Sequence, residues 1–252
     1  MRAIITGASS GIGLALAREL AKRGYALALL APPMELPEQH ARELPRAVGI
    51  GCDVTDAAAV GEAVRRGEAE LGGPFDVAVA NAGVKLPIQA QQFELDAAEQ
   101  IIRVNVLGMM SLFAAVIPSM VARRSGRFVG TASLAGLRGF PSMSVYSASK
   151  AAMQAFLEAA RIELVPHGVG VTIVNPGFVA TPMTEGSRSR LPFLVQPERA
   201  AEIIADGIER GKRVVEFPLA MSLLMRVMRY VPDALYERMT GRFGRADLKE
   251  SK

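Results

Sequence analysis

The chain has 252 residues, of which 50% are hydrophobic and 21% charged, a balance that predicts a globular protein and excludes a disordered one. Its 29 basic and 25 acidic residues are interleaved along most of the chain, and the net charge of +4 therefore does not indicate a nucleic-acid-binding surface. The single cysteine, Cys52, excludes an internal disulfide framework, and with only His40 and His167 to join it we expect no metal site.

These features predict a soluble protein of a reducing compartment, the cytoplasm. Met1 is followed at once by a strand-like run, so we expect no signal peptide. No uninterrupted apolar stretch reaches the roughly 20 residues that span a bilayer.

Short β-rich runs alternate with longer helical patterns up to about residue 218, as in βαβ units on a parallel sheet. The predicted strands are residues 2–6, 25–31, 47–54, 75–81, 127–133, 169–175 and 213–217. With no long linker and no fixed repeat, the expected fold class is α/β: one doubly wound, Rossmann-type domain over residues 1–252. Its parallel sheet would have about seven strands, helices on both faces, and a ligand site beyond the carboxyl ends of the strands.

A glycine-rich turn, Thr6 to Gly13, follows the first predicted strand. Glycines permit close backbone approach, and the helix predicted for residues 14–23 would offer N–H groups to a pyrophosphate. The spacing is neither G-x-G-x-x-G nor a P-loop. We interpret the turn as phosphate-binding, with a purely structural turn of small residues as the alternative.

Three residues further along the chain suggest acid/base chemistry. Ser133 ends a predicted strand, and Tyr146 and Lys150, four residues apart, share one face of the next helix. A nearby ammonium favours the phenolate, so we expect Lys150, aided by the positive oxidised nicotinamide, to lower the pKa of Tyr146 from its usual value of about 10. Ser133 would hydrogen-bond the substrate oxygen, and a cofactor would carry hydride. Taken alone, Tyr146 and Lys150 could equally be a surface pair.

Together these motifs resemble the short-chain dehydrogenase/reductase family over residues 2–217. The matching residues are the T-G-x-x-x-G-x-G pattern of Thr6 to Gly13, the N-A-G of Asn81 to Gly83, and the tetrad Asn105, Ser133, Tyr146 and Lys150. The resemblance implies an NAD(P)-dependent oxidoreductase that transfers hydride between nicotinamide and a carbonyl or alcohol, with Tyr146 as general acid/base. A catalytically silent nucleotide-binding regulator of the same fold is the alternative.

The resemblance also implies individual roles. Lys150 would bind the nicotinamide ribose, Asn105 would hold a water that relays protons, and Asn81 would steady the sheet. The residues implied in cofactor binding are Gly7, Ser9, Ser10, Gly11, Ile12, Gly13, Asp53, Val54, Asn81, Ala82, Gly83, Tyr146, Lys150, Pro176, Gly177, Val179 and Thr181. Asp53 alone could be ordinary structure before a helix capped by Thr55.

The end of the second predicted strand departs from the family pattern. It reads Leu29-Leu30-Ala31-Pro32-Pro33, with neither the acid typical of NAD-preferring members nor the arginine typical of NADP-preferring ones. The missing acid, and hydroxyl donors at Ser9 and Ser10, favour NADP over NAD.

Residues 178–196 are expected to form a substrate lid, and its apolar residues suggest a lipophilic carbonyl substrate, with simple packing as the alternative. The expected substrate contacts are Ser133, Phe140, Met143, Tyr146, Phe178 and Met183, with Leu191, Phe193 and Leu194 also in the lid. Residues 219–252 would be a helical extension that packs on the core or joins subunits, with contact to anionic lipid as the less favoured reading. The family likeness implies a homodimer or homotetramer.

Overall fold

A computed structural model describes residues 1–35, 37–185 and 191–240. Its seven strands form one sheet in the order β3-β2-β1-β4-β5-β6-β7, and every neighbouring pair is parallel. The strands are β1 (Arg2–Thr6), β2 (Ala26–Ala31), β3 (Ala47–Gly51), β4 (Val77–Ala80), β5 (Arg127–Thr131), β6 (Gly170–Pro176) and β7 (Val214–Phe217). The predicted α/β fold class with a doubly wound parallel sheet is confirmed.

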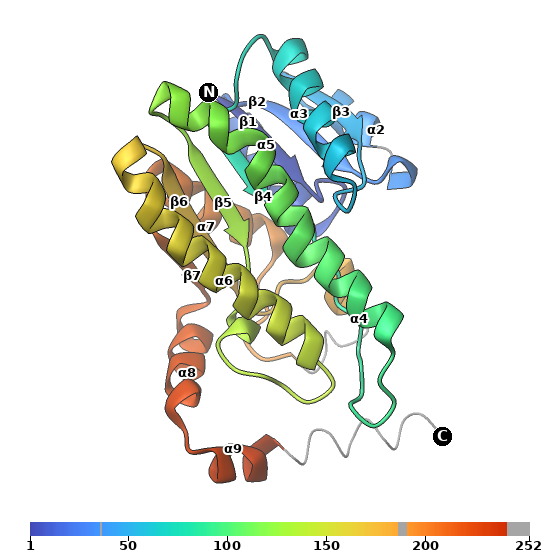
Figure 1. The fold of residues 1–252 in the computed structure, drawn as a ribbon, viewed down its shortest axis with the longest axis vertical. Coiled ribbons are helices and arrows are strands. Elements are labelled where there is room, and N and C mark those ends of the chain that lie inside the picture. The colour runs from blue at the N-terminus through green and yellow to red at the C-terminus, as the bar shows by residue number, and fades with distance from the viewer. Residues whose placement is uncertain (36, 186–190, 241–252) are drawn as a thin grey trace.

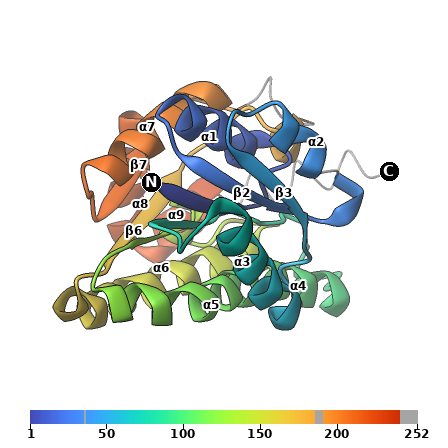
Figure 2. The ribbon, with the colours of Figure 1, turned by 90° about the horizontal axis from the view of Figure 1, so that it is seen from above.

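Helices cover both faces of this sheet (Figures 1 and 2). One layer contains α1 (Gly11–Lys22), α2 (Pro37–Arg42) and α7 (Pro197–Glu209), and the other α3 (Ala57–Leu71), α5 (Gly108–Arg123) and α6 (Ser144–Leu164). Because both faces are covered, the central strands are hydrophobic along their whole length, as in β2, where all six residues are buried.

Three predicted strands are longer than the observed ones. Residues 52–54, 81 and 132–133 were assigned to strands 47–54, 75–81 and 127–133, but lie beyond the ends of β3, β4 and β5. At these residues the chain leaves the carboxyl edge of the sheet. Most of them are still buried or partly buried, so their sequence has the apolar pattern of a strand. This edge carries the candidate site.

A continuous helical run, Leu95–Arg123, consists of α4 (Leu95–Ile102), a π-helical turn η2 (Arg103–Leu107) and α5. By length and composition it could cross a membrane, although charged and polar residues such as Asp96, Glu99 and Arg103 interrupt it, so no uninterrupted apolar stretch of roughly 20 residues is present in it. Its inner side, however, packs on the sheet through residues such as Leu112 and Val116 of the hydrophobic core. The run therefore belongs to the helical layer that packs on this face of the sheet.

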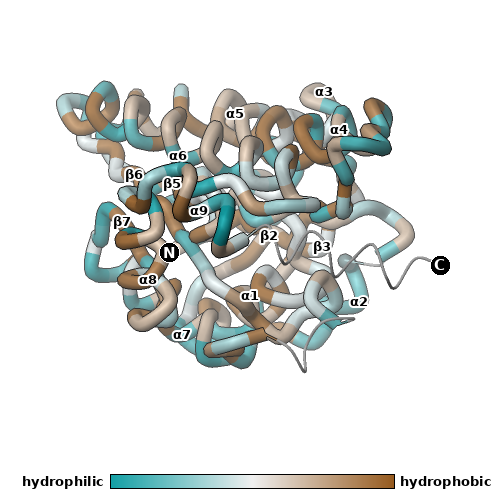
Figure 3. Tube along the Cα trace, turned by 90° about the horizontal axis from the view of Figure 1, so that it is seen from below, coloured by the Kyte–Doolittle hydropathy of each residue, from teal (hydrophilic) through white to brown (hydrophobic). Residues whose placement is uncertain are grey.

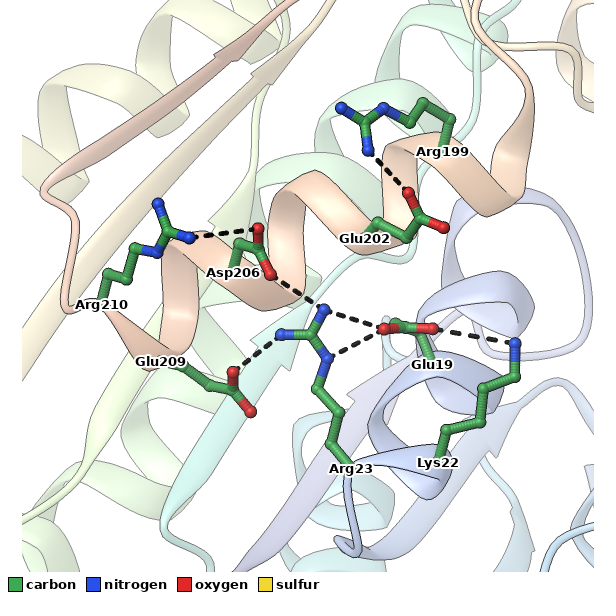
Figure 4. A network of polar contacts seen from close by, with 8 residues as sticks. All are labelled: Glu19, Lys22, Arg23, Arg199, Glu202, Asp206, Glu209 and Arg210. Carbon is green, nitrogen blue, oxygen red and sulfur yellow. Dashed lines mark hydrogen bonds and ion pairs between the residues drawn. The ribbon is translucent and has the colours of Figure 1, made fainter.

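Two neighbouring helices of one layer, α1 and α7, are joined by an ion-pair network (Figure 4). Arg23, at the end of α1, contacts Glu19 at 2.8 Å and two acids of α7, Asp206 at 2.9 Å and Glu209 at 2.7 Å. The first and seventh helices of the chain are therefore linked directly.

Two further helices, α8 (Leu219–Tyr230) and α9 (Asp233–Thr240), lie at the carboxyl end of the sheet (Figures 1 and 3). Short helical turns complete the described fold: η1 (Pro33–Glu35), η3 (Leu134–Gly136) and η4 (Val165–His167). Arg138, after η3, fastens α8 and α9, because its guanidinium donates to the Val231 carbonyl oxygen at 2.7 Å and to Asp233 Oδ1 at 2.7 Å. Residues 241–252 of the expected extension lie outside the described residues.

Candidate active site

A cavity of about 1660 Å³ opens at the carboxyl edge of the sheet. It is lined by the glycine-rich turn, by the segments that follow β3, β4, β5 and β6, and by α8. Pockets for one drug-sized ligand are typically about 300–1,000 Å³, so this cavity has room for a dinucleotide and a substrate together.

The glycine-rich turn places the start of α1 at one end of this cavity. Gly7 and Gly11 have φ angles of +63° and +53°, which favour glycine, and a Cβ on Gly13 would lie 2.1 Å from the Gly7 carbonyl oxygen. The helix N-terminus has no side-chain cap from Ser10 and no acid in its first turn. Its N–H groups therefore remain available to a phosphate, and the residues present fit a dinucleotide.

Asn81 holds β4 against this turn. Its Nδ2 donates to the carbonyl oxygens of Thr6 at 3.2 Å and Gly7 at 3.1 Å, and its backbone N–H donates to Thr6 Oγ1 at 3.0 Å. The side chain thus bonds within the sheet edge, in the way expected of it.

Asn105 lies on the π-helical turn η2 and is fully buried. Its Oδ1 accepts from the Val84 N–H at 2.8 Å, and its Nδ2 donates to the Val84 carbonyl oxygen and to Ser149 Oγ, both at 3.0 Å. These bonds tie the segment after β4 to α6, and the role of Asn105 in holding a relay water stays a prediction.

Ser133 joins the ends of two neighbouring strands. Its Oγ accepts from the Ala135 N–H at 3.1 Å and donates to the Pro176 carbonyl oxygen at 3.4 Å. Gln154 supports this arrangement from α6, because its Nε2 donates to the Ser133 carbonyl oxygen at 2.9 Å and to Asn175 Oδ1 at 2.8 Å. Sequence reasoning did not identify Gln154, which shares a helix face with Lys150.

Tyr146 and Lys150 are both buried on the first turns of α6, and both line the cavity with Ser133. Lys150 Nζ donates to the Thr131 carbonyl oxygen at 2.8 Å and lies 5.8 Å from the centre of the Tyr146 ring. The two side chains therefore meet in one cleft, as their spacing predicted.

The expected effect of Lys150 on Tyr146 is not found in the cofactor-free protein. Burial raises the pKa of Tyr146, opposed only by its hydrogen bond with Ser133, and burial lowers the pKa of Lys150 to about 7. Within the described residues, the partners of Lys150 are a carbonyl oxygen and a thioether, so burial disfavours its charge with no anion to oppose the effect.

The remaining residues predicted to bind cofactor also line the cavity. These are Asp53, Val54, Ala82, Gly83, Pro176, Gly177, Val179 and Thr181. Asp53 Oδ1 accepts from the Thr55 N–H at 2.9 Å, and the N-cap of α3 is Asp56 rather than the expected Thr55. Asp56 Oδ1 reaches two free N–H groups of the first turn, those of Ala58 and Ala59, which fixes the cap one residue later.

An acid that the sequence analysis missed stands beside the glycine-rich turn. Glu35 belongs to η1, which follows β2, and its carboxylate accepts a short hydrogen bond from the Ser9 hydroxyl. Both residues line the cavity. Residues 29–33 carry no acid, as the NADP expectation assumed, but the chain turns after Pro33 and brings Glu35 beside the glycine-rich turn, a contact that the expectation did not consider.

The apolar wall extends further than predicted. Phe140, Met143, Phe178, Met183 and Leu191 line the cavity as expected, whereas Phe193 and Leu194 do not. Phe193 is instead 54% exposed, and residues 186–190 of the expected lid lie outside the described residues. The additional wall residues come from α8 and α9: Met221, Leu224, Met225, Met228, Met239 and Thr240.

Comparisons with known proteins agree with this geometry. A family model described as short chain dehydrogenase matches residues 1–192. An uncharacterized oxidoreductase of Myxococcus xanthus is 39% identical over 241 residues, which cover 93% of this chain and 94% of that protein.

Two relatives carry more specific names. A cis-4-hydroxycyclohexanecarboxylate dehydrogenase of Sinomonas cyclohexanicum is 35% identical, with 81% of this chain and 87% of that protein covered. The ketoacyl reductase HetN of a Nostoc species is 31% identical, with 99% and 91% covered. Among solved structures, a short chain dehydrogenase/reductase family protein superposes with a TM-score of 0.77 at 29% identity, covering 86% of this chain and 95% of that one.

Proposed function

The chain belongs to the short-chain dehydrogenase/reductase family, and from this premise we propose that it transfers hydride between a nicotinamide cofactor and a ketone or secondary alcohol. The observation that carries the proposal is the meeting of Ser133, Tyr146 and Lys150 in the cavity that also contains the uncapped start of α1. The names of two relatives, a ketoacyl reductase and a hydroxy-acid dehydrogenase, support this kind of substrate group.

The mechanism follows from the chain's own groups. A bound nicotinamide supplies or accepts the hydride. In reduction, the Tyr146 hydroxyl donates a proton to the substrate oxygen while Ser133 donates a hydrogen bond to it, so two donors meet the developing alkoxide. In oxidation, Tyr146 takes that proton. Tyr146, whose pKa burial raises, carries its proton at neutral pH and can therefore give it up in a reduction.

We assign the phosphate end of the cofactor to the Gly7–Gly13 turn and the nicotinamide end to Lys150 and the segment after β6. Glu35 supports a preference for NAD over NADP, contrary to the expectation from sequence. Its carboxylate can accept hydrogen bonds from ribose hydroxyls and would repel a 2′-phosphate at the same place. Among the described residues, the lysines and arginines that line the cavity are Lys85, Arg103 and Lys150, none of them in the segments around Ser9 and Glu35.

Calorimetric titration with NADH and with NADPH tests the proposed preference for NAD. We expect NADH to bind at least about tenfold more tightly, and Glu35→Gln to narrow that ratio mainly by improving NADPH binding. Glu38→Gln, a nearby exposed acid on α2, is the matched control and should leave the ratio unchanged. Tighter binding of NADPH by the wild type would contradict the assignment.

The apolar walls support a lipophilic substrate, and residues 178–196 remain the proposed lid. We also propose a cytoplasmic homodimer or homotetramer. The outward side of the long helices supports it, because Leu107 is 48% and Ile162 73% exposed on the layer that carries Asn105 and Tyr146.

A further inference from the structure

Lys85 is a cation of the cavity that the proposed mechanism does not use. It follows Asn81-Ala82-Gly83 by two residues, in a segment without helix or strand, and it is half-buried in the cavity wall. Two residues of extended chain span at most about 7 Å. A Cβ on Gly83 would lie 3.5 Å from Lys150 Nζ, so Lys85 projects from the catalytic end of the cavity rather than from the phosphate-binding turn.

The ammonium of Lys85 has no hydrogen-bond or ion-pair partner within residues 1–35, 37–185 and 191–240. The other cations of the cavity wall are engaged: Arg103 lies 3.7 Å from Glu99, and Lys150 donates to Thr131. Of the acids that line the same cavity, Asp96 and Glu99 are exposed on α4, whereas Glu35 and Asp53 lie in the segments that follow β2 and β3.

Burial alone lowers the pKa of Lys85, with no acid close enough to oppose the shift. A partly desolvated charge without a partner costs free energy, which a bound anion would return. An anion bound beside Lys85 would give this charge the partner that the described residues do not provide.

We propose that Lys85 binds an anionic group of the substrate, so that the enzyme acts on oxo acids or hydroxy acids rather than on neutral ketones and alcohols. The inference rests on the proposed function, since the reacting oxygen must reach Ser133 and Tyr146. The substrate's apolar body then lies against Phe140, Met143 and the methionines of α8, while its carboxylate or other oxyanion pairs with Lys85.

Matched pairs of substrates test this directly. Cyclic and linear oxo acids, each beside its methyl ester, are reduced by the wild type, Lys85→Met and Lys85→Arg, with NADH. We expect the wild type to favour the acid, and Lys85→Met to lose roughly 10- to 100-fold in kcat/KM for acids while the rate with esters stays within about twofold. Lys85→Arg should keep most of the acid preference.

Arg103→Met is the matched control, because it removes a paired cation from the same wall and should leave the acid-to-ester ratio unchanged. An unchanged ratio in Lys85→Met would overturn the proposal, as would a wild type that prefers esters. A phosphorylated ketone, set beside the carboxylates, separates the two sources of oxyanion: whichever loses more in Lys85→Met is the preferred group.

Binding measurements that need no turnover can test the anion site independently of the proposed reaction. Calorimetry with NADH and with unreactive decanoate, set against decanol, should give decanoate affinity that falls at least about tenfold in Lys85→Met, with NADH affinity unchanged. If no ketone is reduced but this result is obtained, the anion site stands and the reaction is wrong. A tenfold loss of NADH affinity in Lys85→Met would instead assign Lys85 to the cofactor's phosphates and overturn the inference.

Discussion

Lys150 is a buried cation whose protein partners are the Thr131 carbonyl oxygen and the Met153 sulfur. Burial lowers its pKa to about 7 in the cofactor-free protein. In the unfolded chain its pKa returns to about 10.5, so between these two values the unfolded state binds more protons. Stability therefore rises with pH in this window.

Removal of the Lys150 charge tests whether burial lowers the pKa of this residue. From pH 7.5 to 9 the wild type should gain about 2 kcal/mol more in free energy of unfolding than Lys150→Met, because one proton corresponds to about 1.4 kcal/mol per pH unit. Urea denaturation of the two cofactor-free proteins at several pH values measures it. Other buried groups, such as Cys52, whose pKa burial raises to about 11, are present in both proteins, so their contributions to the pH dependence of stability cancel in the comparison. Parallel stability curves would show that Lys150 stays charged.

Site residues that belong to a motif with a fixed spacing could be predicted from the sequence. Site residues whose position depends on how a loop folds could not. Ser133, Tyr146 and Lys150 follow a strand end and a helical spacing, and the structure brings them together as expected. Glu35 reaches Ser9 only because η1 folds back after Pro33, and Lys85 is unpaired only because of the folded neighbourhood. Neither position can be derived from local periodicity.

The helices α8 and α9 form the outer wall of the cavity, and Arg138 makes several of the contacts that join them to the body of the protein. Arg138 donates to carbonyl oxygens of Met228, Arg229 and Val231, and its guanidinium stacks 4.1 Å from the ring centre of Tyr236. Tyr236 in turn donates to the Gly139 carbonyl oxygen at 2.7 Å. The contacts satisfy backbone groups at the end of α8 that the helix leaves unpaired.

Arg138→Met should release this wall. We expect hydrogen exchange in residues 219–240 to quicken by about tenfold, which corresponds to about 1.4 kcal/mol of lost local stability. KM for bulky ketones should rise with little change in kcat. Arg199→Met, which removes an exposed ion pair with Glu202 on α7, serves as the control. Unchanged protection of α8 and α9 would mean that their apolar contacts alone hold them.

The succession of elements was largely predictable, since strands and helices alternate with clear punctuation, and all seven strands are present. The contribution of α8 to the cavity wall could not be predicted. Its sequence shows apolar residues nearly all round, and which of them face the cavity depends on Arg138, a residue about ninety positions earlier in the chain.

At the scale of the whole molecule, the network of Arg23 links the beginning of the chain to its seventh helix (Figure 4). Arg23 is only 20% exposed and is shared by three carboxylates. Its loss would leave Glu209 without its ion-pair partner, and Glu19, only 17% exposed, with Lys22 at 3.8 Å alone, which costs more than the loss of one surface pair.

Arg23→Met should therefore lower the free energy of unfolding by about 1–3 kcal/mol. Arg65→Met, which removes an exposed pair with Glu62 on α3, should change it by no more than about 0.5 kcal/mol. Urea unfolding at low and high salt distinguishes the two, because the partly buried network is screened less. Equal effects of the two substitutions would contradict a special role for the network.

In the proposed function, Tyr146 exchanges the proton of a nicotinamide-dependent reaction. The most direct measurement compares NADH oxidation by the wild type and by Tyr146→Phe over a panel of ketones and oxo acids, with NADH affinity determined for both. We predict turnover by the wild type, a loss of about 100- to 10,000-fold in Tyr146→Phe, and NADH affinity within a few-fold. Near-normal turnover by Tyr146→Phe would remove Tyr146 from this role, and NADH binding without any turnover by the wild type would favour a nucleotide-binding regulator instead.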